Sequence, residues 1–432
     1  MKKILIGITM VLLLLAVAPA GSGYAAAEDQ LGQPLATPIG TFGGITYVQY
    51  DGIFEGQTST GTYRVPYRII APADPARGNR TVLVEPPHFV EGTGTLDFNK
   101  LGPDFLFTRG FSYAAIGWST TTDFGFGIFE MRILDPSVPG VFINGGFEDS
   151  DGRTDDEIIV DFARALGVDP VSQRMLGRVD RRYITGFSDS SAPILRLITS
   201  GLATRVFDFA LPYTTSGFDP QTAITNGLYR GKLIIVNSES EGVSVNLVDR
   251  GSAPSQYRFY AVAGSPHVPD PLMPFFSNMT TPASWYPALR AHFLQGDTWV
   301  KRGTPPPPSI HLKTSDGVTL DRDANGNAIA VNGRGQAVPR LPFIELGEAR
   351  FTEDGFLGSY DGVKTITALG FRSHDQYVTA FTAKLAAYLN AGYILREDAD
   401  AIRRRAQLCA PLTFTETYRD AYDNFVALEP CG

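Results

Sequence analysis

The chain has 432 residues, of which 43% are hydrophobic and 19% charged, and its formal net charge is −8. This composition is typical of a globular protein and excludes an intrinsically disordered chain. The chain has no basic stripe, and the short run Arg403–Arg405 follows acidic residues on a predicted exposed helix face. A nucleic-acid partner is therefore not expected.

Residues 1–27 are predicted to be a secretory signal peptide. Lys2 and Lys3 precede an apolar run over 4–18, and small residues follow up to Ala27. A charged start, a short apolar run and a small-residue cleavage site are typical of signal peptides. The run is also shorter than the roughly 20 residues that a membrane span needs. We therefore expect a secreted protein, extracellular or periplasmic, with no stable membrane anchor.

After this leader, the Gly/Pro-rich segment 28–45 is predicted to be flexible, and residues 46–432 are predicted to form one α/β domain. Segments of strand character and helical character then alternate along the chain. The predicted strands are 46–54, 62–73, 80–89, 111–120, 181–186, 205–215, 232–240 and 256–267, and the predicted helices among them are 156–167 and 192–201. This alternation predicts a mostly parallel central sheet with helices on both faces.

The later part of the chain has a different character. Residues 271–360 are rich in Pro, Gly and Asn and are predicted to form a long cap-like excursion over the sheet, before 375–432 return to helices. Within the excursion, Asp321–Asn327 (DRDANGN) begins like a calcium-binding loop. Position twelve of that loop is Asn332 and not the glutamate that closes such sites, so we interpret the motif as a turn and expect no metal.

Two cysteines, Cys409 and Cys431, lie near the end of the chain. A pair of this kind usually forms a disulfide bond in an oxidising compartment. Neither has a Cys-x-x-Cys partner or a histidine close by, which argues against a metal site. Export therefore predicts a Cys409–Cys431 bridge.

The segment RRYITGFSDSSAPILRLITSG, 181–201, places Ser188 between a predicted strand and a predicted helix. Its centre, G-F-S-D-S, is a variant of the G-x-S-x-G nucleophile elbow. In such a turn the flanking backbones nearly touch, so the positions of Gly186 and Ser190 require small residues. The helix that follows directs backbone N–H groups towards developing negative charge. We therefore predict Ser188 as a nucleophile.

A serine nucleophile needs a base, and the base needs an orienting acid. Where an elbow serine begins the set, the chain order is serine, acid, histidine. Glu239 and Glu241 follow the apolar run 232–236 of a predicted strand, and we favour Glu241 because of its distance past that run. His267 lies at the end of the next predicted strand segment and is the predicted base.

The other histidines are less suitable as the base. His88 precedes the serine, His292 lies within a helical segment, His311 lies in the Pro-rich excursion, and His374 begins a late helix. For the oxyanion hole we predict the backbone N–H of Asp189 and one from the loop after 82–85. Because Pro86 and Pro87 begin that loop and have no N–H, His88 or Phe89 would donate there. The alternative is that His88 lines the pocket or has a structural role.

The segments VLVEPPHF, VDRRYITGFSDSSAPILRLI, IIVNSESEG, YRFYAVAGSPHV and YLNAGYILREDADAI together resemble the secreted alpha/beta hydrolase domain family of serine hydrolases. The resemblance covers Thr46 to Ala406. It implies an α/β-hydrolase fold and a triad of Ser188, a glutamate of SESE and His267. Ser190 is a departure, since relatives more often have glycine there.

Together these observations predict a secreted serine hydrolase that cleaves carboxylic esters through an acyl-enzyme, acting on a small-molecule or lipid-like ester. No cofactor is expected. Amide hydrolysis and acyl transfer use the same residues and stay open. The alternative from another class is a secreted protein of this fold that binds a ligand without turnover.

Overall fold

The computed structural model describes residues 30–57, 62–87, 98–118, 132–134, 142–144, 153–268, 283–354, 357–362 and 364–408. The predicted leader, His88, Cys409 and Cys431 lie outside these residues. No helix in the described part of the chain has the length and apolar character that a membrane crossing requires.

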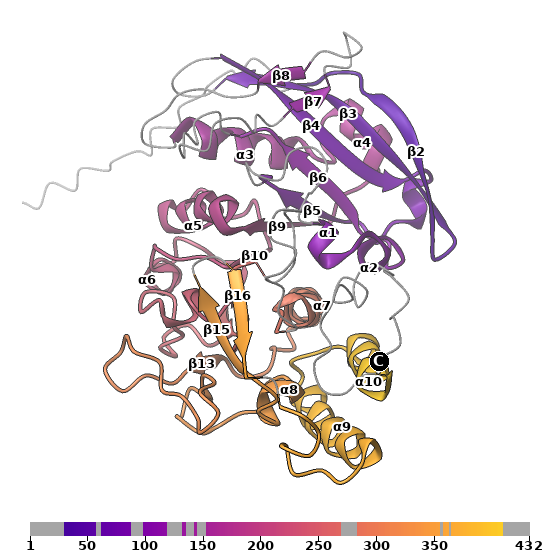
Figure 1. The fold of residues 1–432 in the computed structure, drawn as a ribbon. Helices are drawn as coiled ribbons and strands as arrows, with labels where there is room; N and C mark the ends of the chain where they lie inside the picture. Colours follow the sequence, from indigo (N-terminus) through magenta and orange to yellow (C-terminus); the bar gives the residue numbers. More distant parts are fainter. Residues whose placement is uncertain are drawn as a thin grey trace, which may run out of the picture.

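The described residues form a 12-stranded sheet that runs through the molecule, with two further two-stranded sheets (Figure 1). Its strand order is β1-β3-β4-β6-β5-β9-β10-β11-β12-β13-β14, and β2 pairs with β3. The strands are β1 Gln30–Leu31, β2 Leu35–Phe42, β3 Ile45–Gln57, β4 Thr62–Pro72, β5 Thr81–Glu85, β6 Ser112–Ile116, β9 Arg181–Phe187, β10 Phe209–Tyr213, β11 Lys232–Asn237, β12 Tyr257–Ala261, β13 Ile310–Leu312 and β14 Ala330–Asn332.

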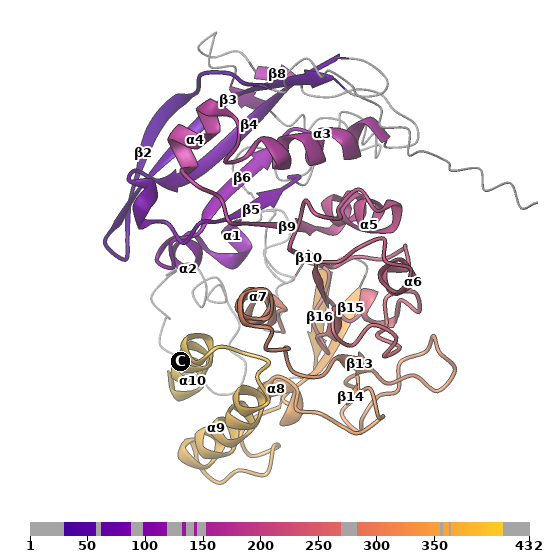
Figure 2. The same cartoon turned by 180° about the vertical axis from the view of Figure 1, so that it is seen from behind.

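The centre of this sheet, from β6 to β13, is parallel. Strands β5, β6 and β10 are buried along their whole length, and β11 is buried except at Lys232. This is expected for strands that are covered on both faces. Helices α5 (Ser191–Ser200) and α7 (Tyr286–Arg302) pack on opposite sides of these strands, as both views show (Figures 1 and 2). The predicted mostly parallel α/β sheet is confirmed.

The other helices surround this centre. Helix α3 packs on α5, and α9 packs on α8 and α10 at the end of the molecule away from β2 (Figure 2). The ranges are α1 Phe98–Leu101, α2 Pro103–Phe107, α3 Arg153–Ala165, α4 Pro170–Leu176, α6 Pro220–Thr225, α8 Pro342–Glu345, α9 His374–Asn390 and α10 Arg396–Leu408; the separate short strands are β7 Arg132–Leu134, β8 Phe142–Asn144, β15 Arg350–Asp354 and β16 Leu357–Asp361.

The segment 28–45, expected to be flexible, instead contains β2, which pairs antiparallel with β3 from Leu35↔Asp51 to Phe42↔Ile45. The connecting residues Gly43 and Gly44 both have positive φ, 56° and 81°. Such a two-residue turn matches the twist of a β-hairpin. Pro38 and Gly40, two of the residues that suggested flexibility, lie on this edge strand, where a missing N–H is tolerated, and the register shifts between them.

The segment 271–360, which was expected to form an excursion over the sheet, instead contributes two strands to the sheet itself. Its first described element, α7, covers a face of the sheet, and Gly296 lies so close to Phe209 that a Cβ there would be 2.1 Å from the ring. Strands β13 and β14 extend the sheet beyond β12. Among the helices and strands described in this range, the short helix α8 and the β15–β16 hairpin lie outside the sheet and α7. Three-residue strands carry too little pattern to be recognised in a Pro-rich sequence.

Helix α10 is attached to the core through buried charge. Asp398 is 1% exposed and pairs with Arg290 at 3.1 Å, while Glu397 pairs with Arg109 at 3.0 Å. Burial raises the pKa of the Asp398 carboxyl to about 7; the Arg290 charge opposes this shift, and the Glu397 charge adds to it. Asp398 therefore binds its proton more tightly in the folded chain than in the unfolded chain.

The pKa of Asp398 is about 4 in the unfolded chain and about 7 in the folded chain. Between these two pH values, the contribution of Asp398 to the free energy of unfolding should fall as the pH rises. Over this range the folded state binds more protons than the unfolded state, so stability falls with pH. Asp398→Asn should reduce the difference in unfolding free energy between the two ends of this range, measured by urea denaturation. An unchanged difference would contradict the prediction.

Candidate active site

The turn at Ser188 connects β9 to α5 through a single 3₁₀ turn, Ser188–Ser190. Ser188 has a φ of 50°, a left-handed conformation that non-glycine residues adopt rarely. A Cβ on Gly186 would lie 2.4 Å from the carbonyl oxygen of Ser190, so glycine is required there. Ser190 fits because its buried hydroxyl turns back and donates to the Phe187 carbonyl at 2.9 Å.

This crowding makes Gly186→Ala a test of the turn. The added methyl group would force the strand and helix apart, and we expect a loss of about 1–3 kcal/mol in unfolding free energy. Ser190→Gly is the matched control, because it removes one hydrogen bond and adds no atoms; its loss should be about 1 kcal/mol. Denaturant titration compares the two, and equal stability of Gly186→Ala and the native chain would contradict this geometry.

His267 lies against Ser188 although 79 positions separate them. Its Nε2 is 2.8 Å from the Ser188 Oγ, and its side chain is only 8% exposed. The loop that carries it follows β12 and is held by Trp285, whose Nε1 donates to the carbonyls of Pro266 and His267 at 3.1 and 3.3 Å. The Phe187 ring packs on the imidazole at a centroid distance of 5.1 Å.

Glu241 contacts the other imidazole nitrogen. Its Oε1 is 2.6 Å from His267 Nδ1, and its Oε2 accepts a hydrogen bond from Ser238. Burial disfavours the charged form, but the bonds from His267, Ser238 and Ser240 outweigh it, so the pKa of Glu241 lies below its ordinary value. An ionised carboxylate at Nδ1 fixes the proton there and leaves Nε2 as the acceptor for the serine hydroxyl.

Glu239, the other predicted acid, points elsewhere. Its Oε2 accepts the Gly264 N–H at 2.6 Å, and its Oε1 pairs with Arg322 at 2.8 Å. Both glutamates follow β11, but the 3₁₀ turn Glu241–Val243 directs their side chains to different partners. Of the two carboxylates, the structure brings Glu241 to the imidazole.

The expected oxyanion donors are only partly described. Asp189 follows Ser188 at the start of the 3₁₀ turn, where its backbone N–H lies beside the serine. Burial raises the pKa of its carboxyl, against the opposing charge of Arg196. His88 lies outside the described residues. The helix that begins at Ser191 adds a positive dipole end on the same side.

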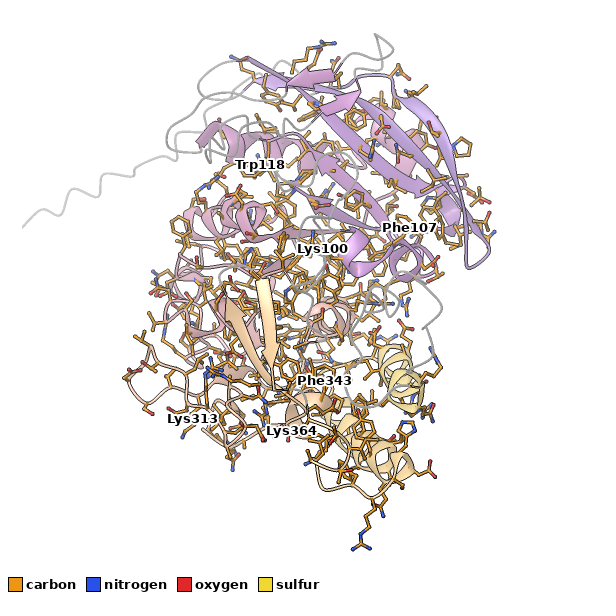
Figure 3. The ribbon with its side chains drawn as sticks, in the orientation of Figure 1. Lys100, Phe107, Trp118, Lys313, Phe343 and Lys364 are labelled. Atoms are coloured by element: carbon orange, nitrogen blue, oxygen red, sulfur yellow. The ribbon has the colours of Figure 1, made fainter. Side chains whose placement is uncertain are left out.

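Three further residues support the site and were not predicted. Asn237, fully buried, donates from Nδ2 to the carbonyls of Thr215 and Glu241 and so fixes the acid's turn. Trp285 holds the histidine loop as described above. Lys100 in α1, near the centre of Figure 3, is buried with its Nζ 4.5 Å from the centroid of the Phe187 ring. Of these three residues, Asn237 alone has a local sequence pattern, because it is a polar residue at the carboxyl end of the apolar strand β11.

The remaining candidates lie apart from this arrangement. His292 is fully buried against Tyr260, and burial lowers its pKa to about 3. His374 Nε2 bonds to the Ala406 carbonyl. In the calcium-like motif, Asp323 accepts the N–H groups of Asn325 and Asn327 and pairs with Arg340, so the motif is a turn held by protein donors.

A mostly parallel sheet with helices on both faces and a tight strand-to-helix turn at Ser188 define a protein of the α/β-hydrolase fold class. The chain belongs to the alpha/beta hydrolase domain family, whose model matches residues 47–404.

Comparisons with other proteins add little beyond this assignment. No curated protein sequence matches the chain. An S-formylglutathione hydrolase from Agrobacterium tumefaciens is similar in structure at 9% identity and TM-score 0.34, covering 53% of this chain and 91% of that one. A glucuronoyl esterase from Solibacter usitatus has 12% identity and a TM-score of 0.29, and the match covers 49% of this chain and 72% of that one. A methylesterase has 13% identity and a TM-score of 0.31. That match covers 49% of this chain and 46% of the methylesterase, so the chain spans less than half of its length. Similarity this distant carries no information about substrate.

Proposed function

We propose that this protein is a serine hydrolase that cleaves carboxylic esters through an acyl-enzyme intermediate. The observation that carries the proposal is the continuous contact from Ser188 Oγ to His267 Nε2 and from His267 Nδ1 to Glu241 Oε1, at 2.8 and 2.6 Å. Both distances are those of hydrogen bonds suited to general-base activation of a hydroxyl.

In the proposed first half-reaction, Ser188 Oγ attacks the ester carbonyl carbon while its proton moves to His267 Nε2. Glu241 stabilises the resulting imidazolium. The carbonyl oxygen becomes an oxyanion that the Asp189 N–H stabilises. When the tetrahedral intermediate collapses, the C–O bond to the alcohol breaks, and His267 returns its proton to the departing oxygen.

In the second half-reaction, a water molecule gives a proton to His267 and attacks the acyl carbon. Collapse of the second tetrahedral intermediate releases the carboxylic acid, and Ser188 Oγ recovers its proton from the imidazole. Each proton transfer uses the same nitrogen, because Glu241 keeps Nδ1 protonated throughout.

The test is a panel of nitrophenyl esters of increasing acyl length, incubated with the mature protein, together with a fluorophosphonate probe. The proposal expects turnover of at least one ester and covalent labelling of the protein. A folded protein that binds an ester and neither turns it over nor reacts with the probe would favour the non-catalytic ligand-binding alternative.

We also propose that the protein is exported, with cleavage after Ala27 and a Cys409–Cys431 disulfide. The argument is the charged and apolar pattern of the first 27 residues together with the pair of cysteines. Mass spectrometry of the secreted chain tests both the cleavage site and the disulfide. The mass of the chain identifies its first residue, and thiol alkylation with and without reductant should differ by two modified cysteines. Alkylation without reductant would contradict the bridge.

A further inference from the structure

Glu239 lies beside the site but does not contact His267 in the described residues, and its interactions are extensive for a buried carboxylate. It is 2% exposed. Its side chain accepts the Gly264 N–H at 2.6 Å, and its own N–H donates to the Ser265 carbonyl at 2.8 Å. Glu239 thus binds two consecutive residues of the loop that carries His267.

The charge of Glu239 is balanced by Arg322 alone among the described ion pairs, at 2.8 Å. The Arg322 side chain is 31% exposed and that of Glu239 only 3%, so the arginine reaches inward from the surface to a buried carboxylate. A buried carboxylate that loses its partner is strongly unfavourable, because burial removes the water that would otherwise stabilise the charge.

Arg322 is held in place by the DRDANGN turn. Asp323 Oδ1 accepts the N–H groups of Asn325 and Asn327 at 2.8 and 3.0 Å, and its Oδ2 pairs with Arg340 at 2.8 Å. Arg322 Nη1 also donates to the Gly326 carbonyl at 3.1 Å. The calcium-like sequence therefore forms a rigid turn that presents a guanidinium to Glu239.

The same loop is enclosed on another side. Gly264 has a φ of 76°, and a Cβ there would lie 2.7 Å from Ile344 Cδ1 and 3.1 Å from Phe351 Cβ. The loop is thus restrained by the Glu239 carboxylate and by side chains of α8 and β15. Its backbone cannot shift without breaking one of these contacts.

We propose that Glu239 and Arg322 are positioning residues, which hold the Gly264–Ser265 backbone and thereby fix the distance between His267 Nε2 and Ser188 Oγ. This inference rests on the proposed function. Of the two neighbouring glutamates, Glu241 acts on the imidazole directly, and Glu239 acts through the loop backbone. A displacement of about 1 Å in such a group can reduce turnover about 100-fold.

The experiment compares Arg322→Met, Arg322→Lys, Glu239→Gln and the double variant Glu239→Gln/Arg322→Met. Arg322→Met should lower kcat by about 10- to 100-fold with little change in KM, since an unbalanced carboxylate displaces the loop. Glu239→Gln keeps an acceptor for Gly264 N–H and needs no cation, so its loss should stay within about fivefold. The double variant should therefore recover most of the activity lost in Arg322→Met, and Arg322→Lys should recover part.

Arg64→Met is the matched control, because it breaks an exposed ion pair with Glu55 between β3 and β4. It should leave kcat unchanged. The fraction of each variant that a fluorophosphonate finally labels measures the folded fraction, and the rate of labelling should fall in parallel with kcat.

A native kcat in Arg322→Met, or a double variant less active than Arg322→Met, would overturn the positioning role. These results are distinct from failure of the proposed function, in which the native chain itself would show neither turnover nor labelling.

Discussion

Ser188→Ala should abolish ester hydrolysis, with a loss in kcat of roughly 10⁴- to 10⁶-fold. Ser188 Oγ is the only atom of the proposed mechanism that forms a covalent bond to the substrate, and it lies 2.8 Å from His267 Nε2. The variant should fold normally, because alanine is smaller than serine and the positive φ is already present. The measurement is steady-state hydrolysis of the best ester in the panel.

Labelling by a fluorophosphonate gives an independent readout of the same change. Ser188→Ala should show none, and Ser200→Ala, at the other end of α5, should label like the native chain because its hydroxyl bonds with the backbone of Leu197 and Leu202 and not with the site. Equal labelling of Ser188→Ala and the native chain would show that another residue is the nucleophile.

Glu241→Gln should lower kcat by about 10³- to 10⁴-fold, whereas Glu239→Gln should have a much smaller effect. An amide at position 241 carries no charge to stabilise the imidazolium and can donate to Nδ1, which would leave the proton on the wrong nitrogen. Glu239→Gln leaves the 2.6 Å contact between Glu241 and His267 intact. The two variants are matched, since each replaces one carboxylate oxygen by nitrogen.

The pH dependence of ester hydrolysis by the native chain supplies a check on this assignment. The pKa of Glu241 lies below its ordinary value because His267, Ser238 and Ser240 donate to it against the effect of burial. The carboxylate should therefore stay charged through neutral and mildly acidic pH. Loss of turnover in Glu239→Gln but not in Glu241→Gln would contradict the roles assigned to the two residues.

Local sequence patterns were sufficient for the elbow. Gly186, Ser188 and Ser190 lie within five residues, and the requirement for small flanking residues follows from one tight turn between a strand and a helix. The parallel sheet was likewise predictable, because most residues of its buried strands are apolar. The turn depends on residues that are neighbours in the sequence, and the sheet depends on the burial of apolar side chains.

Composition was misleading where pairing decided the structure. Segment 28–45 reads as flexible, yet Leu35–Phe42 forms β2 because β3 is long enough to pair with it and Gly43-Gly44 supplies the turn. Strands β13 and β14 have three residues each and depend on an open edge at β12. No periodicity can be recognised in elements this short.

The sequence by itself determined the fold class, the elbow at Ser188 and the short set of carboxylates and histidines at strand ends. Only the tertiary structure decided which glutamate meets His267, and it did so through contacts between residues distant in sequence. Glu239 and Glu241 are two positions apart and chemically alike, so their roles differ only because Arg322 and Gly264 engage one and His267 engages the other. Side-chain direction in a turn after a strand is set by such partners, and a local pattern cannot encode them.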